Sequence, residues 1–493
     1  MTAESKSDET QLVDVSTVVL SEEPVIAVGD SCSAKEEKVE DELPEKPKAV
    51  KEDVLMDSKP TEEEEGEEKE ASSVEKELYP SLGSVLVQKS CSFREESNFL
   101  SDLKDNEKRA LLELRVMLEE AILENKLLES AKEGDDMEVK GAVVDVTLWG
   151  VPLLPSRCVE STNVILLKFL RARDFKVDDA FNMLRTTIRW RKEHSIDTVV
   201  DEEDLGGGEV EATAYMGGTD RDGHPVCYNV FGLFQEDGLY QKIFGSEEKV
   251  DKFLRWRFQL IEKEIQKMNF NPGSVTSIVQ VIDLKNAPGI FKKELRNAMK
   301  KAVGVLQDNY PEFVAKTIFI NVPLWYCAVN TLLSPFLTKR TKSKFIFSRS
   351  ANVTETLLRY IPAESIPRRY GGLRHPNECE GEFAAVKGGG GGVSEVIVKA
   401  GCTESIEIPV ITVGMNVVWD LTVLGWDVNY KEEFVPDDDG SYTVIIQKGR
   451  KMAAHEEPIR NSFKNNEPGK IVLAVENNGF KKKKIFFRYK NNI

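Results

Sequence analysis

The sequence is poor in the patterns that mark metal sites and covalent catalysis. Its 493 residues include only 4 histidines and 7 cysteines, and no pair of them has metal-ligand spacing. A Gly-x-Ser-x-Gly elbow, a His-Glu-x-x-His helix and a Gly-Lys-Ser/Thr phosphate loop are all missing. We therefore expect no catalytic residue, no metal and no cofactor, and a binding protein rather than an enzyme.

Long apolar runs are missing too. No stretch of roughly 18 uninterrupted apolar residues occurs, so the sequence predicts no membrane-spanning helix. The N-terminus has no apolar signal core, and Thr2 stands where N-myristoylation requires glycine. The odd, scattered cysteines fit a reducing compartment. We expect a cytoplasmic protein whose contact with membranes is peripheral.

Negative charge is concentrated at one end of the chain. Residues 1–80 hold 25 acidic residues against 9 lysines, a net charge of −16, while the whole chain carries −18. The remaining residues are therefore nearly neutral, at about −2. A segment so charged and so poor in apolar periodicity is predicted to be a disordered acidic tail, either solvating or regulatory. The acidic pI describes this tail and says little against an anionic partner of the folded part. Because the protein is acidic overall and its one basic patch is short, we expect no nucleic-acid partner.

Helical periodicity follows the tail and predicts an N-terminal helical lobe over residues 90–200. Apolar residues recur at helical spacing from Leu100 to Ile122, with interleaved Lys and Glu. Residues 161–193 read as two further helices, the second capped by Asp178 or Asp179.

Residues 201–376 alternate between strand-like and helical patterns. Runs rich in β-branched and aromatic residues are separated by amphipathic stripes, which predicts an α/β domain with a mainly parallel sheet. The predicted strands lie at 224–232, 276–284, 316–323 and 343–348.

A Gly-rich linker is predicted over 377–392, because five consecutive glycines end it. Beyond it, strand signals recur about every ten residues and are divided by turn clusters such as Asp-Asp-Asp-Gly. Residues 393–493 are therefore predicted to form an all-β sandwich.

Six segments of the middle region follow one another in the order of a known family. They are LLKFLRARDF (166–175), DRDGHPVCY (220–228), VIDLKNAPG (281–289), LQDNYPEFVAKTIFINVP (306–323), SPFLTKRTKSKFIF (334–347) and IPAESIPRRYGGL (361–373). Together they resemble the CRAL-TRIO family of cytosolic lipid-binding and lipid-transfer proteins. The C-terminal sandwich resembles a GOLD domain, and the order of acidic tail, CRAL-TRIO and GOLD resembles the patellins, a plant family. This resemblance implies phosphoinositide binding and membrane trafficking, including the cell plate at cytokinesis.

The resemblance also implies which residues contact the headgroup of a bound phosphatidylinositol or phosphoinositide. It assigns the inositol-contacting glutamate and lysine to Glu312 and Lys344, with Thr341 beside them and Arg173 in the same region. Such residue types suit the ligand, since phosphates need cations and ring hydroxyls need an acceptor.

Two residues depart from the pattern of relatives that bind phosphatidylinositol. Phe313 follows Glu312 where such relatives often carry Arg, and Asp174 follows Arg173 where they carry Lys. Each change removes a positive charge, so the affinity and the phosphate pattern stay open. A structural alternative for the pair also stays open, with Glu312 as a helix-end residue and Lys344 as a solvated strand-edge cation.

A second set of residues matches the gating helix of the family. Its aromatic and aliphatic side chains are expected to form a gate over the lipid, with an ordinary core helix as the alternative. The gate residues are Trp325, Leu332, Leu333 and Phe336.

A basic run lies in the predicted sandwich, after an Asn-Asn-Gly turn. Lys481, Lys482, Lys483, Lys484 and Arg488 are expected to anchor the protein to anionic membranes, each contributing about 1 kcal/mol near the surface. The alternative is a solvated face.

Two function hypotheses follow. The first is a phosphoinositide- and phospholipid-binding peripheral membrane protein. The second is a protein-interaction adaptor, whose GOLD domain recruits trafficking proteins and whose CRAL-TRIO cavity is structural.

Overall fold

The computed structural model describes most of the chain beyond residue 93. The predicted acidic tail and the glycines up to residue 391 lie outside the described residues. No helix within the described part is both long and apolar enough to cross a membrane. The described residues are 94–124, 126–127, 146–154, 159–203, 205–288, 292–323, 343–376, 383, 392–454 and 456–492.

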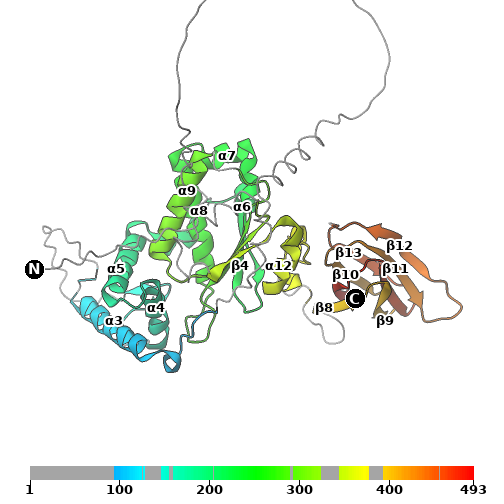
Figure 1. Cartoon of the computed structure of the whole chain (residues 1–493), viewed down its shortest axis with the longest axis horizontal. Helices are drawn as coiled ribbons and strands as arrows, with labels where there is room; N and C mark the ends of the chain where they lie inside the picture. Colours follow the sequence, from blue (N-terminus) through cyan, green and yellow to red (C-terminus); the bar gives the residue numbers. More distant parts are fainter. Residues whose placement is uncertain are drawn as a thin grey trace, which may run out of the picture. The chain divides into compact units, whose positions relative to one another are not determined.

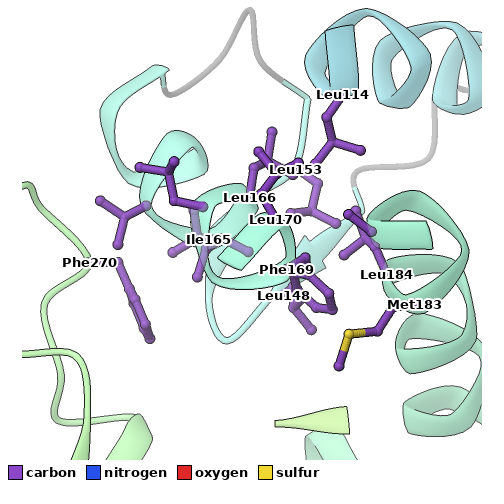
Figure 2. Packing of buried hydrophobic residues seen from close by; sticks show 14 of the residues in the cluster. Leu114, Leu148, Leu153, Ile165, Leu166, Phe169, Leu170, Met183, Leu184 and Phe270 are labelled. Atoms are coloured by element: carbon purple, nitrogen blue, oxygen red, sulfur yellow. The ribbon is translucent and has the colours of Figure 1, made fainter. Parts of the chain in front are cut away.

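Three helices form the N-terminal lobe, as predicted (Figure 1). Helix α3 (Asp105–Leu123) follows the 3-10 turn η2 (Leu100–Asp102) and packs against α4 (Val159–Ala172) and α5 (Val177–Glu193). The short strands β1 (Thr147–Leu148) and β2 (Val151–Pro152) form an antiparallel pair beside them. Figure 2 shows Leu114, Leu148, Phe169 and Leu184 among the buried side chains of this core.

Helix α5 begins slightly before the predicted capping residues. Its N-cap is Lys176, without a side-chain cap bond, and Asp178 and Asp179 lie inside the first turn. The capping prediction was therefore wrong. The two carboxylates still lie near the positive end of the helix dipole, where negative charge is favourable.

A five-stranded mixed sheet forms the middle of the chain. Its order is β3-β4-β5-β6-β7, with β3 antiparallel to β4 and all other neighbours parallel. The mainly parallel sheet was predicted; the edge strand β3, which contains two glycines, was not. The strands are β3 (Ala214–Thr219), β4 (Pro225–Val230), β5 (Ile278–Asp283), β6 (Val314–Ile320) and β7 (Phe345–Phe347).

Both faces of this sheet are covered, which explains why its strands are apolar at consecutive positions. Val226 and Tyr228 of β4 enter a core shared with α12 (Val353–Tyr360), whereas Cys227 enters the core of the helical lobe. A further core joins α7 (Asp237–Phe244), α8 (Glu247–Ile265) and α9 (Lys293–Asn309). Shorter elements connect these, namely α6 (Glu209–Thr213) and the 3-10 turns η3 (Ile196–Asp201), η4 (Phe231–Gln235), η6 (Ser350–Asn352), η7 (Ala363–Ser365) and η8 (Arg368–Tyr370).

The C-terminal part is the predicted β-sandwich, built of two four-stranded antiparallel sheets. Their orders are β13-β10-β15-β8 and β12-β11-β14-β9. Strand patterns at 396–398, 406–413, 417–423, 442–446, 471–475 and 485–487 predict six of these strands from the sequence, whereas β11 and β13 were not predicted. The strands are β8 (Ser394–Val398), β9 (Cys402–Val410), β10 (Asn416–Val423), β11 (Val428–Pro436), β12 (Val444–Met452), β13 (Ile459–Lys464), β14 (Gly469–Asn477) and β15 (Lys483–Asn492).

A buried carboxylate lies at the centre of the sandwich. Glu432 of β11 is fully buried and accepts hydrogen bonds from Trp419 Nε1 (3.2 Å), Tyr430 OH (2.8 Å) and Asn461 Nδ2 (2.7 Å). Burial raises the pKa of Glu432, although these three donors favour its charged form. The network compensates for the desolvation of a polar group inside the core.

Candidate functional site

The two residues assigned to headgroup contact lie together at one end of the parallel strands. Glu312 occupies the turn between α9 and β6, with a left-handed φ of 55°, and Lys344 directly precedes β7. Lys344 Nζ lies 2.8 Å from Glu312 Oε2 and donates to the Val314 carbonyl at 3.0 Å. The side chains are 14% and 17% exposed, so Lys344 is not a solvated cation, while Glu312 does lie just beyond the end of α9.

A third charged residue, Lys168 of α4, supports this pair from the buried side. Its Nζ donates to the carbonyls of Thr276 (2.7 Å) and Glu312 (2.9 Å) and lies 4.1 Å from the centre of the Phe313 ring. Burial lowers the pKa of Lys168 to about 7, against the opposing fields of Glu95 and Glu312. Phe313, a departure from the family pattern, is thus a cation–π partner that helps to hold a buried ammonium.

A small polar pocket opens beside Lys168 and Glu312. Its volume of about 20 Å³ is enough for roughly one water molecule. Its walls come from α4, the entries to β5 and β6, and a segment preceding α3. The lining residues are Glu95, Glu96, Asn98, Lys168, Arg171, Thr276 and Glu312.

Among the other predicted headgroup and gate residues, the structure describes Arg173 alone, and Arg173 makes a local contact. Arg173 follows the end of α4, and its guanidinium donates to the carbonyl of neighbouring Ala172 at 3.3 Å. Thr341 lies outside the described residues, and so do all four gate residues, Trp325, Leu332, Leu333 and Phe336. Their roles stay predictions.

A buried charge network adjoins the pocket. His224 lies between Glu95 (Nε2 to Oε2, 3.0 Å) and Asp220 (Nδ1 to Oδ1, 3.0 Å), and Lys316 Nζ contacts Asp220 at 3.3 Å and Asp222 at 3.0 Å. Despite burial, these carboxylates raise the pKa of His224 to about 9. Asp220, Asp222 and His224 have the spacing of metal ligands. Because a protonated imidazole and a lysine already contact the carboxylates, the donor set suits ionic pairing rather than a metal.

The basic run of the sandwich divides into exposed and engaged side chains. Lys481 and Lys482 are exposed in the turn between β14 and β15. Lys483 is half-buried, and its Nζ donates to the carbonyls of Gly425 and Trp426, while Lys484 pairs with Glu395.

The assignment of Arg488 to this membrane-contacting patch was wrong. Arg488 is 3% exposed, and its guanidinium lies 2.8 Å from Asp420 Oδ2, which is also buried. It donates to the Leu373 carbonyl at 2.7 Å and lies over the Phe383 ring. Since β15 alternates sides, a cation in a basic run can still face inward.

Three features of these surfaces were not predicted from the sequence. Lys168 is a cation within the apolar run LLKFL, which was a readable signal for a buried charge. Glu95 and Glu96 lie in a segment without periodicity and gave no signal. Phe480, which precedes the four lysines, is fully exposed.

Comparison with known proteins agrees with this architecture. The sequence matches the family descriptions "CRAL/TRIO, N-terminal domain" at residues 110–186, "CRAL/TRIO domain" at 210–372 and "Patellin-1-like, C-terminal GOLD domain" at 399–483. The fold and these matches define a CRAL/TRIO protein with a C-terminal GOLD domain.

Similar whole proteins narrow this class. Patellin-4 of Arabidopsis thaliana is 45% identical over 500 residues, covering 82% of this chain and 90% of Patellin-4. Patellin-3 of the same plant is 45% identical over 417 residues, covering 84% and 81%. A protein named phosphatidylinositol transfer protein SFH5, of Scheffersomyces stipitis, is 32% identical over 242 residues, covering 46% and 71%. The chain belongs to the patellin family.

The raised pKa of His224 predicts a specific dependence of stability on pH. Because the pKa of His224 is about 9 in the folded protein and 6.5 for an ordinary histidine, its protonation stabilises the fold fully below pH 6.5, and this stabilisation is lost as the pH rises through 9. Between pH 7 and 9.5 we expect the wild type to lose about 2 kcal/mol of unfolding free energy relative to His224→Gln, measured by urea denaturation.

Wild type and His224→Gln must be compared because the titration of Lys168 changes the stability of both proteins in the opposite direction to that of His224. Its lowered pKa makes the folded state more stable as the pH rises above 7, in both proteins. Parallel stability curves for wild type and His224→Gln would contradict the assignment of a charged His224.

Proposed function

We propose that this chain is a peripheral membrane protein that binds phospholipid, with phosphatidylinositol or a phosphoinositide as its ligand. The observation that carries the proposal is the half-buried Glu312–Lys344 pair at the end of the parallel strands. A carboxylate accepts from inositol hydroxyls and an ammonium neutralises phosphate, so the pair offers what the headgroup needs.

The surroundings of the pair support a ligand site over a purely structural ion pair. Both side chains keep some exposure, while Lys168 fixes the Glu312 backbone from behind. Such a supported, partly open charge pair is pre-organised for a polar ligand. The phosphatidylinositol transfer protein noted above gives further support, because this chain is 32% identical to it over 242 residues.

The sandwich supplies a candidate contact with the membrane. Lys481 and Lys482 project from the β14–β15 turn, and Phe480 beside them is fully exposed. Lysines attract an anionic leaflet, and an exposed aromatic ring gains from leaving water at the interface. Lys483 and Lys484 contribute less to this contact, because backbone carbonyls and Glu395 engage them.

Through these two surfaces the protein acts in membrane trafficking, including the cell plate during cytokinesis. It resides in the cytoplasm and at membranes, where the GOLD sandwich meets trafficking proteins. We propose no catalytic activity for it. This part of the proposal rests on the trafficking role that the resemblance to the patellins implies.

Replacing Lys344 tests the headgroup assignment. Lys344→Met should lower phosphatidylinositol loading by about tenfold or more, because a hydrogen bond to a charged group contributes about 1.5–3 kcal/mol. Loading is measured by mass spectrometry after incubation with mixed vesicles. Loss of one partner of a half-buried pair also lowers stability.

Two controls separate the site from general damage. Lys300→Met removes an exposed lysine of α9 and should leave loading unchanged. Phosphatidylcholine, which lacks inositol, should still load into Lys344→Met. Equal phosphatidylinositol loading by Lys344→Met and Lys300→Met would contradict the assignment.

Charge reversal in the sandwich tests the membrane contact. Lys481→Glu with Lys482→Glu should weaken cosedimentation with anionic vesicles by at least about tenfold, since each lysine contributes about 1 kcal/mol. Lys448→Glu with Lys464→Glu is the matched control, because both residues are exposed in the same sandwich. Equal binding by the two double variants would contradict the membrane contact and would mean that the turn is an ordinary solvated surface.

A further inference from the structure

The segment 94–98, which we call the strap, contributes Glu95, Glu96 and Asn98 to the wall of the polar pocket next to the headgroup pair. Two of its side chains are carboxylates, and both contact cations from the body of the protein. Glu95 contacts His224 at 3.0 Å and accepts from Ser277 Oγ, while Glu96 lies 3.5 Å from Arg171 Nε. The strap contains neither helix nor strand.

Arg171 is the main attachment of the strap. Its guanidinium is 8% exposed and donates from Nη1 to Asn98 Oδ1 at 2.6 Å and from Nη2 to the Ser97 carbonyl at 2.7 Å. With the Nε contact to Glu96, every nitrogen of this buried cation faces the strap. A planar guanidinium with paired donors is also a preferred partner of phosphate.

The strap supplies two of the carboxylates that face the cations near the pocket. Five basic side chains among the described residues lie near five carboxylates, and they would lie near three if Glu95 and Glu96 moved away. The cations are Lys168, Arg171, His224, Lys316 and Lys344, and the other carboxylates are Asp220, Asp222 and Glu312.

A phosphomonoester offers the same negative charge and hydrogen-bond acceptors as the two carboxylates of the strap. It carries a charge of about −1.5 to −2 and three strong acceptor oxygens. Arg171, protonated His224 and the Ser277 hydroxyl are the donors that Glu95 and Glu96 occupy. Two carboxylates and one phosphomonoester dianion therefore satisfy the same groups.

We propose that this pocket is a phosphomonoester site, which the strap keeps closed by placing Glu95 and Glu96 where the phosphate would bind. Ligand binding then requires release of the strap, so the strap lowers the affinity of the site. The proposal deepens the proposed function, since Glu312 borders both the pocket and the headgroup pair. A phosphoinositide headgroup in a membrane and a soluble inositol phosphate share the required chemistry.

Calorimetric titration of the full chain with inositol 1,4,5-trisphosphate tests the proposal. Glu95→Gln with Glu96→Gln should bind this ligand at least about tenfold more tightly than the wild type, because neutral amides compete poorly for the cations. Glu113→Gln with Glu120→Gln makes the same charge change at exposed positions of α3 and should leave affinity unchanged. Adding Arg171→Gln to the strap variant should abolish the gain.

Equal affinities of the strap variant and the α3 control, both for inositol trisphosphate and for the phosphatidylinositol 4-phosphate vesicles described below, would overturn the proposal. A second measurement needs no variant, because hydrogen exchange of residues 94–98 in the wild type should rise when saturating inositol trisphosphate binds. Unchanged exchange under saturation would overturn it as well.

The source of the phosphate is distinguished by a parallel titration with vesicles containing phosphatidylinositol 4-phosphate. Enhanced binding of the strap variant to the soluble ligand indicates a soluble inositol phosphate, and enhancement with vesicles alone indicates a membrane headgroup; enhancement with neither overturns the proposal. Phosphatidylinositol contains only a phosphodiester. Its loading therefore reports on the Lys344 assignment separately from the strap.

Discussion

The buried ammonium of Lys168 connects the parts of the molecule on which the candidate site depends. It extends from α4 of the helical lobe and bonds to carbonyls at the entries to β5 and β6. A buried cation is costly to desolvate, so its position is fixed by the few groups that compensate it, here two carbonyls and the Phe313 ring. One of these carbonyls belongs to Glu312. The lobe therefore fixes the backbone of the residue proposed to meet the headgroup.

Most of the fold was predictable because its strands and helices bury continuous or periodic apolar faces. The parallel strands were found since both faces of their sheet are covered. Strand β11 was missed because Lys431, Glu432 and Glu433 interrupt its apolar pattern. Only the three-dimensional structure supplies the three donors that make a buried Glu432 compatible with a strand.

The candidate site was predictable in part. Family resemblance paired Glu312 with Lys344 across 32 positions of the chain, and the structure places their charged atoms 2.8 Å apart. Arg488 was misassigned because its inward partner, Asp420, lies on a neighbouring strand and is not apparent from a run of lysines. The carboxylates of the strap left no periodic signal, since their role depends on contacts with residues far along the chain.

The central claim is that the chain binds a phospholipid by its headgroup. Mass spectrometry of lipid extracted from the full-length protein, after incubation with vesicles of equal phosphatidylinositol and phosphatidylcholine content, tests this claim most directly. We predict one phospholipid per chain, with phosphatidylinositol enriched over its proportion in the vesicles. Protein that carries no phospholipid, or phospholipid in the same proportions as the vesicles, would contradict the account.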